Sequence, residues 1–382
     1  MLTSLLQDNF PRDVQIRQLA QHLARKYERG TPVVRSGDLV RRSNTYPIVS
    51  AAIPTQTNSA GIDQDGTDFS YFAQVLLGSN STPLYMLLDT GAATTWVMGP
   101  SCSSAPCKSH NSFGAGDSTT FQPTTTSFSI AYGSGAVSGM YGKDSLTLAG
   151  ITITMEIGIA NVTSSDFNNF PIDGLLGLAR ADSTTPTFLN ALVASKALKS
   201  NIFGISLNRN SDGPNTGEIN FGAPDPSKYN GNLNYIGVSP SSTLGDWAIP
   251  LDNAGSGANE AGITGELAYI DTGTSYIFCP PASCSTFYAQ IPGAVLTSDN
   301  ETWTVPCATT ISLTFTFGGT AYTVSPKDWI GPMVDGVCTS NVFGHVVVAG
   351  AWLLGDTFLK NVYTVFDVDQ NRVGKYALDN TG

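Results

Sequence analysis

An all-β protein with two similar lobes is the fold that the sequence predicts, and three observations lead to it. Short runs of alternating apolar and polar residues recur at residues 128–132, 151–154 and 311–317, with Gly, Pro, Asn and Asp between them. Such runs are typical of strands joined by turns, and little of the chain shows sustained helical periodicity. The 382 residues are enough for two substantial cores, and one short motif occurs twice.

The repeated motif is Asp-Thr-Gly, and each copy follows two apolar residues. The first copy reads Leu-Leu-Asp-Thr-Gly-Ala at residues 87–92, and the second reads Tyr-Ile-Asp-Thr-Gly-Thr at residues 269–274. The apolar pair indicates the end of a buried strand, and Gly allows a tight turn that holds a carboxylate away from water. A single copy would be an ordinary turn. Two matched copies predict that each lobe delivers one aspartate, Asp89 or Asp271, to a shared site.

Six motifs in the same order and at similar spacing make most of the chain resemble the pepsin-like aspartic proteases. They are the two Asp-Thr-Gly loops with Trp96 seven residues after the first aspartate, the flap-like run 130–135 with Tyr132, the bracing segments 173–179 and 352–356, and the closing strand 363–367. The resemblance implies a bilobal double-psi β-barrel architecture with a few short helices.

The resemblance also implies an aspartic endopeptidase that needs no cofactor and no metal. Asp89 and Asp271 would share one proton, because two carboxylates about 3 Å apart cannot both ionise easily. The ionised member would act as general base on a water while the other donates to the scissile carbonyl oxygen. The residues implied to support the dyad or to line the flap and pocket are Thr90, Gly91, Thr272, Gly273 and Trp96, with Tyr132, Gly133, Ser134, Leu87, Leu175, Tyr269 and Thr274. Phe167 and Ile172 are further candidates for the pocket wall, or are plain core.

One residue departs from pepsin, which has Ser after its first Asp-Thr-Gly where this chain has Ala92. A serine hydroxyl there would donate to the carboxylate and favour its charged form, so its absence predicts a higher pKa in the dyad. We therefore expect an activity optimum less acidic than that of pepsin, at about pH 4 to 5. Because Ser134 is neutral, we expect a preference for large apolar residues around the scissile bond.

The first 42 residues form a basic head of net charge +4 on a body of net charge −15. A helix is predicted over residues 13–28 from the spacing of its apolar residues. In the resembling family, Lys26 and Tyr27 would belong to a prosegment that inhibits the site, since an ammonium between two carboxylates favours their ionised forms. Arg25 is a competitor for this role, and Lys26 could instead lie on the solvated face of the helix.

In the resembling family, the mature chain begins at a usual distance before the first catalytic aspartate. Counting back from Asp89 by this distance predicts a prosegment and linker over residues 1–60, with the boundary between 43 and 66. Arg41-Arg42 is either a dibasic processing site or loop charge. Residues 35–68 are polar and read as an exposed linker, with strands beginning at residues 71–77. The N-terminal lobe is then expected at residues 67–235 and the C-terminal lobe at residues 236–382.

Six cysteines fit an oxidising compartment, and by number alone they allow fifteen pairings. The resemblance implies the pairs Cys102–Cys107 and Cys307–Cys338, which leaves Cys279 with Cys284 as a stapled turn. A zinc site is poorly supported, because none of the three histidines is spaced with the cysteines as in such sites.

The sequons at Asn80, Asn161 and Asn300 permit N-glycosylation, and with the disulfides they suggest a secreted or alternatively a vacuolar enzyme. The start of the chain lacks the basic leader and apolar core of a signal peptide, so we expect that a signal was removed. No apolar run approaches the length of a membrane span, and the acidic body would repel nucleic acid. The expected partners of this monomer are peptide and protein substrates, its own prosegment and pepstatin-type inhibitors.

Two other functions compete with proteolysis. A catalytically silent relative could bind peptides, but both aspartates and the flap tyrosine are intact. A secreted sugar-binding β-sandwich would not need paired Asp-Thr-Gly motifs, and it would tolerate Asp89→Asn. A serine or cysteine hydrolase is disfavoured because His22, His110 and His345 have no recognisable nucleophile partner.

Overall fold

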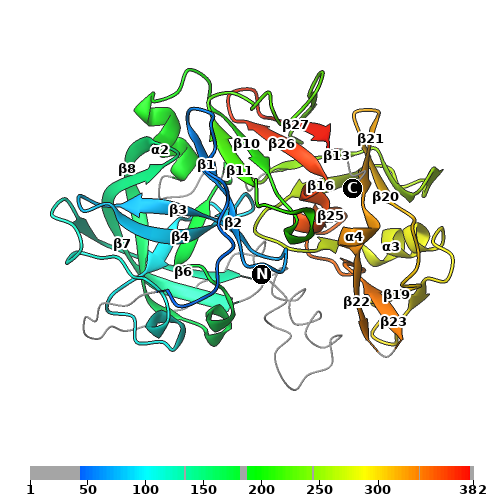
Figure 1. The fold of residues 1–382 in the computed structure, drawn as a ribbon, viewed down its shortest axis with the longest axis horizontal. Helices are drawn as coiled ribbons and strands as arrows, with labels where there is room; N and C mark the ends of the chain where they lie inside the picture. Colours follow the sequence, from blue (N-terminus) through cyan, green and yellow to red (C-terminus); the bar gives the residue numbers. More distant parts are fainter. Residues whose placement is uncertain (1–43, 133–134, 181–186, 243–244, 335, 379–382) are drawn as a thin grey trace.

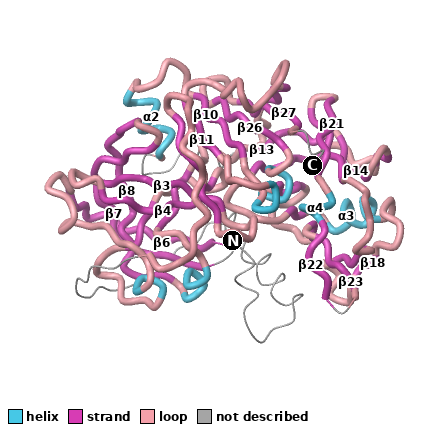
Figure 2. The backbone as a smooth tube through the Cα atoms, viewed as in Figure 1, coloured by secondary structure: helices cyan, strands magenta, loops and turns pink. Residues whose placement is uncertain are grey.

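The computed structural model describes residues 44–132, 135–180, 187–242, 245–334 and 336–378. Within these ranges the chain is mostly β with a few short helices, which confirms the predicted all-β class. Figure 1 shows the N-terminal half, in blue to green, beside the C-terminal half, in yellow and orange, with strands from both between them. Short helical segments are scattered among long strands and loops (Figure 2).

The N-terminal lobe contains an eight-stranded sheet with the order β2-β3-β4-β9-β5-β8-β7-β6, and a further pairing of β3 with β7 curls it back on itself. Its strands are β2 (Asp63–Gln64), β3 (Tyr71–Leu77), β4 (Thr82–Asp89), β5 (Trp96–Met98), β6 (Gln122–Tyr132), β7 (Gly135–Leu148), β8 (Ile151–Thr163) and β9 (Gly174–Gly177). Ala149 and Gly150 join β7 to β8 with φ of 54° and 76°. Two positive φ values suit a two-residue hairpin turn, whose twist matches that of the strands.

The C-terminal lobe is built from three smaller sheets. The five-stranded sheet has the order β13-β16-β25-β17-β24, and the two four-stranded sheets have the orders β15-β14-β20-β21 and β18-β19-β23-β22. The strands of the first sheet are β13 (Ala248–Leu251), β16 (Glu266–Ile270), β17 (Ile277–Phe278), β24 (Val342–Phe343) and β25 (Ala351–Leu354). The strands of the others are β14 (Asn253–Ser256), β15 (Asn259–Glu260), β20 (Leu313–Phe317) and β21 (Thr320–Val324), then β18 (Val295–Leu296), β19 (Trp303–Val305), β22 (Ile330–Val334) and β23 (Val337–Ser340).

The helices of the described residues are short. The α-helices are α2 (Phe188–Ser195), α3 (Pro281–Tyr288), α4 (Pro326–Trp329) and α5 (Asp356–Leu359), and the 3₁₀ helices are η2 (Pro106–Lys108), η3 (Ser165–Asn169) and η4 (Asn210–Asp212). Thr187 caps α2 by accepting a hydrogen bond from the backbone N–H of Asn190, which satisfies one of the free donors of the first turn.

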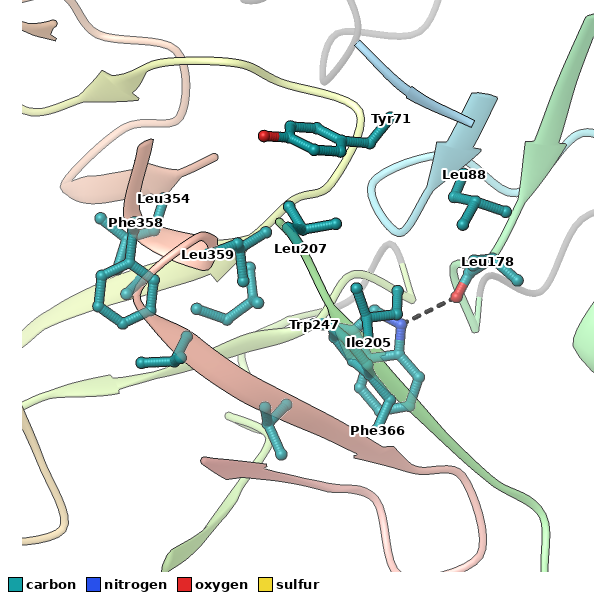
Figure 3. Close-up of a cluster of buried hydrophobic side chains, with 14 of the residues drawn as sticks. Tyr71, Leu88, Leu178, Ile205, Leu207, Trp247, Leu354, Phe358, Leu359 and Phe366 are labelled. Carbon is teal, nitrogen blue, oxygen red and sulfur yellow. Dashed lines mark hydrogen bonds between the residues drawn. The ribbon is translucent and has the colours of Figure 1, made fainter. Parts of the chain in front are cut away.

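A six-stranded sheet with the order β1-β11-β10-β26-β27-β12 contains strands from both halves of the chain. Its strands are β1 (Ser59–Gly61), β10 (Ile202–Ser206), β11 (Glu218–Phe221), β12 (Asn234–Gly237), β26 (Val362–Asp367) and β27 (Arg372–Ala377). Figure 3 shows Trp247 packed beside Ile205 and Phe366 of this sheet, with its indole N–H donating to the carbonyl oxygen of Leu178 at 2.9 Å. This buried contact joins the C-terminal lobe to the segment that braces the first aspartate.

The expectation that strands begin at residue 71 is wrong, because β1 and β2 lie within the stretch read as a linker. Ser59 pairs with Asn220 and Gly61 with Glu218, at the edge of the six-stranded sheet. A three-residue edge strand of small residues has no apolar alternation, so sequence patterns do not reveal it. Its pairing is backbone to backbone and depends on a partner more than 150 residues away.

A buried ionic cluster of Arg209, Asp328 and Lys360 connects the two predicted lobes. The guanidinium of Arg209 donates through Nε to Asp328 Oδ1 at 2.9 Å and through a terminal nitrogen to Oδ2 at 2.7 Å. Lys360 Nζ lies 3.2 Å from Asp328 Oδ1, and all three side chains are at most 9% exposed. Burial opposes ionisation of Asp328, but Lys360 and Arg209 outweigh it and hold the pKa of this carboxyl below its ordinary value.

We predict that Arg209→Met lowers the free energy of unfolding by about 3 to 5 kcal/mol near neutral pH, because it leaves a buried carboxylate incompletely paired. A depressed carboxyl pKa contributes stability above the unfolded pKa of about 3.9, and this contribution is lost as the pH falls through the folded pKa. The loss caused by the substitution should therefore shrink in strong acid. Urea unfolding at about pH 6 and pH 2 measures both values.

Lys327→Met is the matched control, since its ammonium lies 3.8 Å from Asp212 and its side chain is 49% exposed. An exposed pair contributes little, so this variant should unfold almost like the parent chain at both pH values. Equal losses for the two variants would contradict a special role of the buried cluster.

Candidate active site

Asp89 and Asp271 stand at corresponding places in the two lobes. Asp89 ends β4 and Asp271 directly follows β16, and their exposed fractions are 2% and 1%. In each lobe this strand runs parallel to the strand of the apolar-apolar-Gly segment: Leu87 pairs with Leu175, and Tyr269 pairs with Leu353. Strands buried on both faces need continuous apolar runs, which explains the residues that precede each Asp-Thr-Gly.

The two loops are tied to each other by a reciprocal set of hydrogen bonds. Thr90 Oγ1 donates to the carbonyl of Ile270 at 2.8 Å, and Thr272 Oγ1 donates to the carbonyl of Leu88 at 2.7 Å. Each threonine oxygen also accepts from the backbone N–H of the other, at 3.0 and 3.1 Å. All of these groups are buried, and a buried polar group without a partner destabilises the fold. Each of these hydrogen bonds therefore has to form for the two loops to pack together.

Gly91 and Gly273 let the aspartates come close to the opposite loop. The N–H of Gly91 donates to Asp89 Oδ1 and the N–H of Gly273 to Asp271 Oδ1, both at 2.9 Å. A Cβ at Gly91 would lie 2.6 Å from Asp271 Oδ1, and one at Gly273 would overlap the carboxyl of Asp89. The carboxyls therefore converge on one place, and any larger residue in these turns would push them apart.

The two turns differ at the residue after glycine. Ala92 and Thr274 make the same backbone contact, each donating to the carbonyl of its own aspartate at 3.3 Å. Thr274 Oγ1 also donates to Asp271 Oδ2 at 2.8 Å, whereas the methyl group of Ala92 has no such donor and packs in an apolar cluster. The two carboxyls thus have unequal hydrogen-bonding environments in otherwise equivalent turns.

Tyr132 ends β6 in the β6–β7 hairpin, beside Trp96. The indole N–H of Trp96 donates to the Tyr132 hydroxyl at 2.9 Å. Burial, with a further contribution from the charge of Asp89, raises the pKa of Tyr132 well above its ordinary value, so the phenol stays neutral. Gly133 and Ser134 lie outside the described residues.

The expected pocket residues of the first lobe are buried together. Leu87, Phe167, Ile172 and Leu175 belong to one apolar cluster that also contains Trp96 and Tyr132. The ring of Phe167 meets Trp96 edge-on with centroids 5.3 Å apart. Tyr269 lies in a separate cluster with Leu353 in the second lobe. The side chains of the first lobe thus form core packed with Trp96 and Tyr132.

The sequence analysis gave Asp356 no role of its own. Asp356 follows Gly355 in the second bracing segment, and Leu178 occupies the corresponding position after Gly177 in the first. Its Oδ1 is buried and has no hydrogen-bond partner within the described residues. Burial raises the pKa of Asp356 well above its ordinary value, and the neighbouring Asp271 adds to this shift. Aligning the two bracing segments would have exposed it, because only the second has an acid directly after the apolar-apolar-Gly run.

The structure also shows where the predicted disulfides and the predicted glycosylation sequons lie. The disulfides Cys102–Cys107, Cys279–Cys284 and Cys307–Cys338 are present, which confirms the expected pairing. Asn80 and Asn300 are exposed, whereas Asn161 is half-buried in β8 with Oδ1 enclosed. Lys26, Tyr27, Arg25 and Arg41-Arg42 lie outside the described residues. Among the residues described, no cluster of His, Cys, Asp and Glu could hold a metal ion, and no helix could span a membrane.

Two buried aspartates on braced, pseudo-equivalent loops beneath a tyrosine-bearing hairpin define the class as a two-lobed aspartic peptidase. The family description "Eukaryotic aspartyl protease" matches residues 70–377, and the chain belongs to this pepsin-like family. It is 41% identical over 339 residues to the aspartic-type endopeptidase ctsD of Aspergillus fumigatus, covering 88% of this chain and 71% of that protein. It is 34% identical over 320 residues to pepsin A of Sus scrofa, covering 80% of this chain and 81% of pepsin.

A third relative is the major aspartyl peptidase 1 of Cryptococcus neoformans, 32% identical over 346 residues, which cover 83% of this chain and 70% of that peptidase. The protein is thus an aspartic-type endopeptidase that acts on protein substrates. Its disulfides are consistent with the secretory pathway, where thiols are oxidised.

We predict that Asp356→Asn makes the fold more stable than the parent chain as the pH rises from about 4 towards 7. A carboxyl whose folded pKa is raised stays protonated in the native state after the unfolded chain has ionised. The native state then binds more protons, and stability falls with rising pH. The amide of Asn does not titrate. Melting temperatures against pH measure the effect; parallel curves for the two proteins would rule it out.

Proposed function

We propose that this endopeptidase works in acid, with Asp89 and Asp271 as its catalytic dyad, and that it is made as a self-inhibited precursor. The observation that carries the proposal is the reciprocal Thr90–Thr272 brace, which supports a fixed approach of two buried carboxyls. A singly protonated dyad has one ionised member to take a proton from a bound water and one protonated member to donate to the scissile carbonyl oxygen. No covalent intermediate is required.

Tyr132 and the hairpin that carries it act as a cover over the bound peptide. An extended substrate can pair backbone to backbone with the free edge of such a hairpin, which gives affinity with little sequence preference. Closing the hairpin excludes water and aligns the bond to be cut. The apolar clusters below it favour large apolar residues on either side of the scissile bond, and the neutral Ser134 adds no charge.

The precursor part of the proposal rests on the charge of the chain. Residues 1–42 are basic and the rest is acidic, so the head is attracted to the site that Lys26 and Tyr27 would occupy. Secretion is the location that we propose, because the three disulfides and the exposed sequons at Asn80 and Asn300 suit the secretory pathway; a vacuolar enzyme, the alternative, would share both features.

The test is to acidify the purified chain with and without pepstatin and to follow both its mass and the cleavage of denatured protein. We expect a new N-terminus between residues 43 and 66, with a gain of activity that pepstatin blocks. Asp89→Asn and Asp271→Asn should each reduce kcat by at least about 10³-fold, and the double variant should be scarcely worse, because the two groups act as a unit.

Each Asn variant should also fail to shorten itself, although active parent enzyme added in trace amounts should cut it. Full cleavage activity in either variant would exclude the dyad. Activity that is normal without shortening would exclude the precursor and leave the dyad standing.

We predict that Ala92→Ser moves the acid limb of the pH–rate profile down by about one pH unit, since a hydroxyl in this turn donates to the charged carboxylate. The geometry is that of Thr274, whose Oγ1 reaches Asp271 Oδ2 at 2.8 Å. Thr274→Val is the matched variant and should move the same limb upward. Profiles of kcat against pH that do not move in either variant would show that these hydroxyls do not tune the dyad.

A further inference from the structure

His110 lies just after η2 in the N-terminal lobe, fully buried, with both ring nitrogens directed at carbonyl oxygens. Nδ1 is 2.6 Å from the carbonyl oxygen of Pro106, and Nε2 is 2.7 Å from the carbonyl oxygen of Phe170. Its ring thus spans two separate segments, η2 and the end of η3. Neither the dyad nor the hairpin includes this residue.

The two carbonyls determine which form of the ring fits. A carbonyl oxygen only accepts hydrogen bonds, and a neutral imidazole has one N–H and one bare nitrogen. A neutral ring would bond to one carbonyl and place its lone pair against the other, inside a dry site. Only the imidazolium form donates to both. The site is therefore complete when His110 is doubly protonated.

The groups around the ring are compatible with a positive charge. Tyr46 stacks on the imidazole with centroids 4.7 Å apart, an arrangement that a cationic ring strengthens. Asp173 interacts electrostatically with His110, and Asn111, next in the chain, donates to both of its carboxyl oxygens, at 2.8 and 2.9 Å. Burial raises the pKa of Asp173, and its N–H donors and His110 act against that shift.

The other charged groups on these elements are peripheral. Lys108 on η2 is exposed and Asp166 on η3 is half-exposed, so water screens both. Asp173 is thus the charged group that shares the interior with the ring. Its carboxyl also accepts from Asn44 Nδ2 at 3.0 Å, which ties the N-terminal strap, residues 44–46, to the same cluster.

The segment that His110 holds forms the wall beneath the hairpin. Phe170 lies between Phe167 and Ile172, and all three belong to the apolar cluster of Trp96 and Tyr132. Phe167 and Phe170 meet edge-on with centroids 6.2 Å apart. A change at the Phe170 carbonyl is therefore transmitted by direct packing to the wall that the substrate is proposed to contact.

We propose that His110, as an imidazolium, is a positioning residue for this wall: it clamps η2 to the end of η3 in acid and releases the clamp when it loses its proton. The released carbonyl is left without its donor, so the wall becomes less ordered and binds substrate more weakly. The stabilisation exists in acid and disappears as the pH rises through the range in which the ring deprotonates. The effect on substrate binding rests on the proposed pocket, whereas the state of the ring does not.

The first test is a ¹⁵N NMR titration of the full chain, which has only three histidines to assign, His22, His110 and His345. We expect both ring nitrogens of His110 to be protonated throughout the acidic range. When the ring loses one proton at higher pH, the signals of Phe167 and Phe170 should change with it. A ring that carries one proton in the folded protein at acid pH would overturn the proposal, whatever the enzyme's activity.

The second test measures KM and kcat against pH for one peptide substrate. His110→Gln has one amide nitrogen in place of two ring nitrogens, so it can reach the carbonyl at only one of the two positions. KM in acid should therefore rise about tenfold, the factor expected for one unmade buried hydrogen bond, with kcat little changed. Its KM should no longer depend on ring deprotonation. His345→Gln is the control, because its Nδ1 lies 3.1 Å from Glu301 in the other lobe, and it should keep the parent profile.

A KM profile of His110→Gln that coincides with the parent at every pH would overturn the positioning role. If this variant does not fold, the NMR titration of the parent chain decides alone. Loss of all activity in the parent chain, with a doubly protonated ring, would count against the proposed function and leave the clamp intact.

Discussion

The rest of the structure depends on the exchange of hydrogen bonds between Thr90 and Thr272. Each side chain donates to a carbonyl that precedes the other lobe's aspartate and accepts from the other threonine's N–H. These groups are buried, and a buried polar group left unpaired costs about 1 to 3 kcal/mol. The two loops are therefore held in one position relative to each other. Because the bonds are reciprocal, the strands that lead into the two loops must have nearly equivalent geometry.

That equivalence extends from the loops to the strands, with two exceptions beside the aspartates. Each aspartate strand runs parallel to a bracing strand, in the same register. The pairs that break the equivalence are Ala92 with Thr274 and Leu178 with Asp356. Both differences place extra polar groups near Asp271, so the second lobe supplies the more polar half of the site. Two identical halves could not distinguish a base from an acid without help from the substrate.

The sequence was sufficient for the features that repeat or that lie close together along the chain. It predicted β3 and the paired aspartate loops, and it singled out Trp96 and Tyr132, because each depends on a local pattern or on a family motif. It did not predict β1, the Arg209–Asp328 pair or the clamp at His110. Their partners are separated by 60 to 161 residues, and nothing in the local sequence of either member indicates the other.

The buried polar groups of this fold also limit the pH range in which it is stable. Asp356 has a raised pKa, so its contribution to stability decreases as the pH rises. Lys375 in β27 has a pKa lowered well below its ordinary value by burial, so its contribution decreases as the pH falls. The ring of Phe317, 4.5 Å from the ammonium, offsets part of the desolvation. The buried Lys375 thus opposes stability in acid, and the ion pairs of Asp328 are a compensating interaction that persists there, because their carboxyl keeps its charge at lower pH.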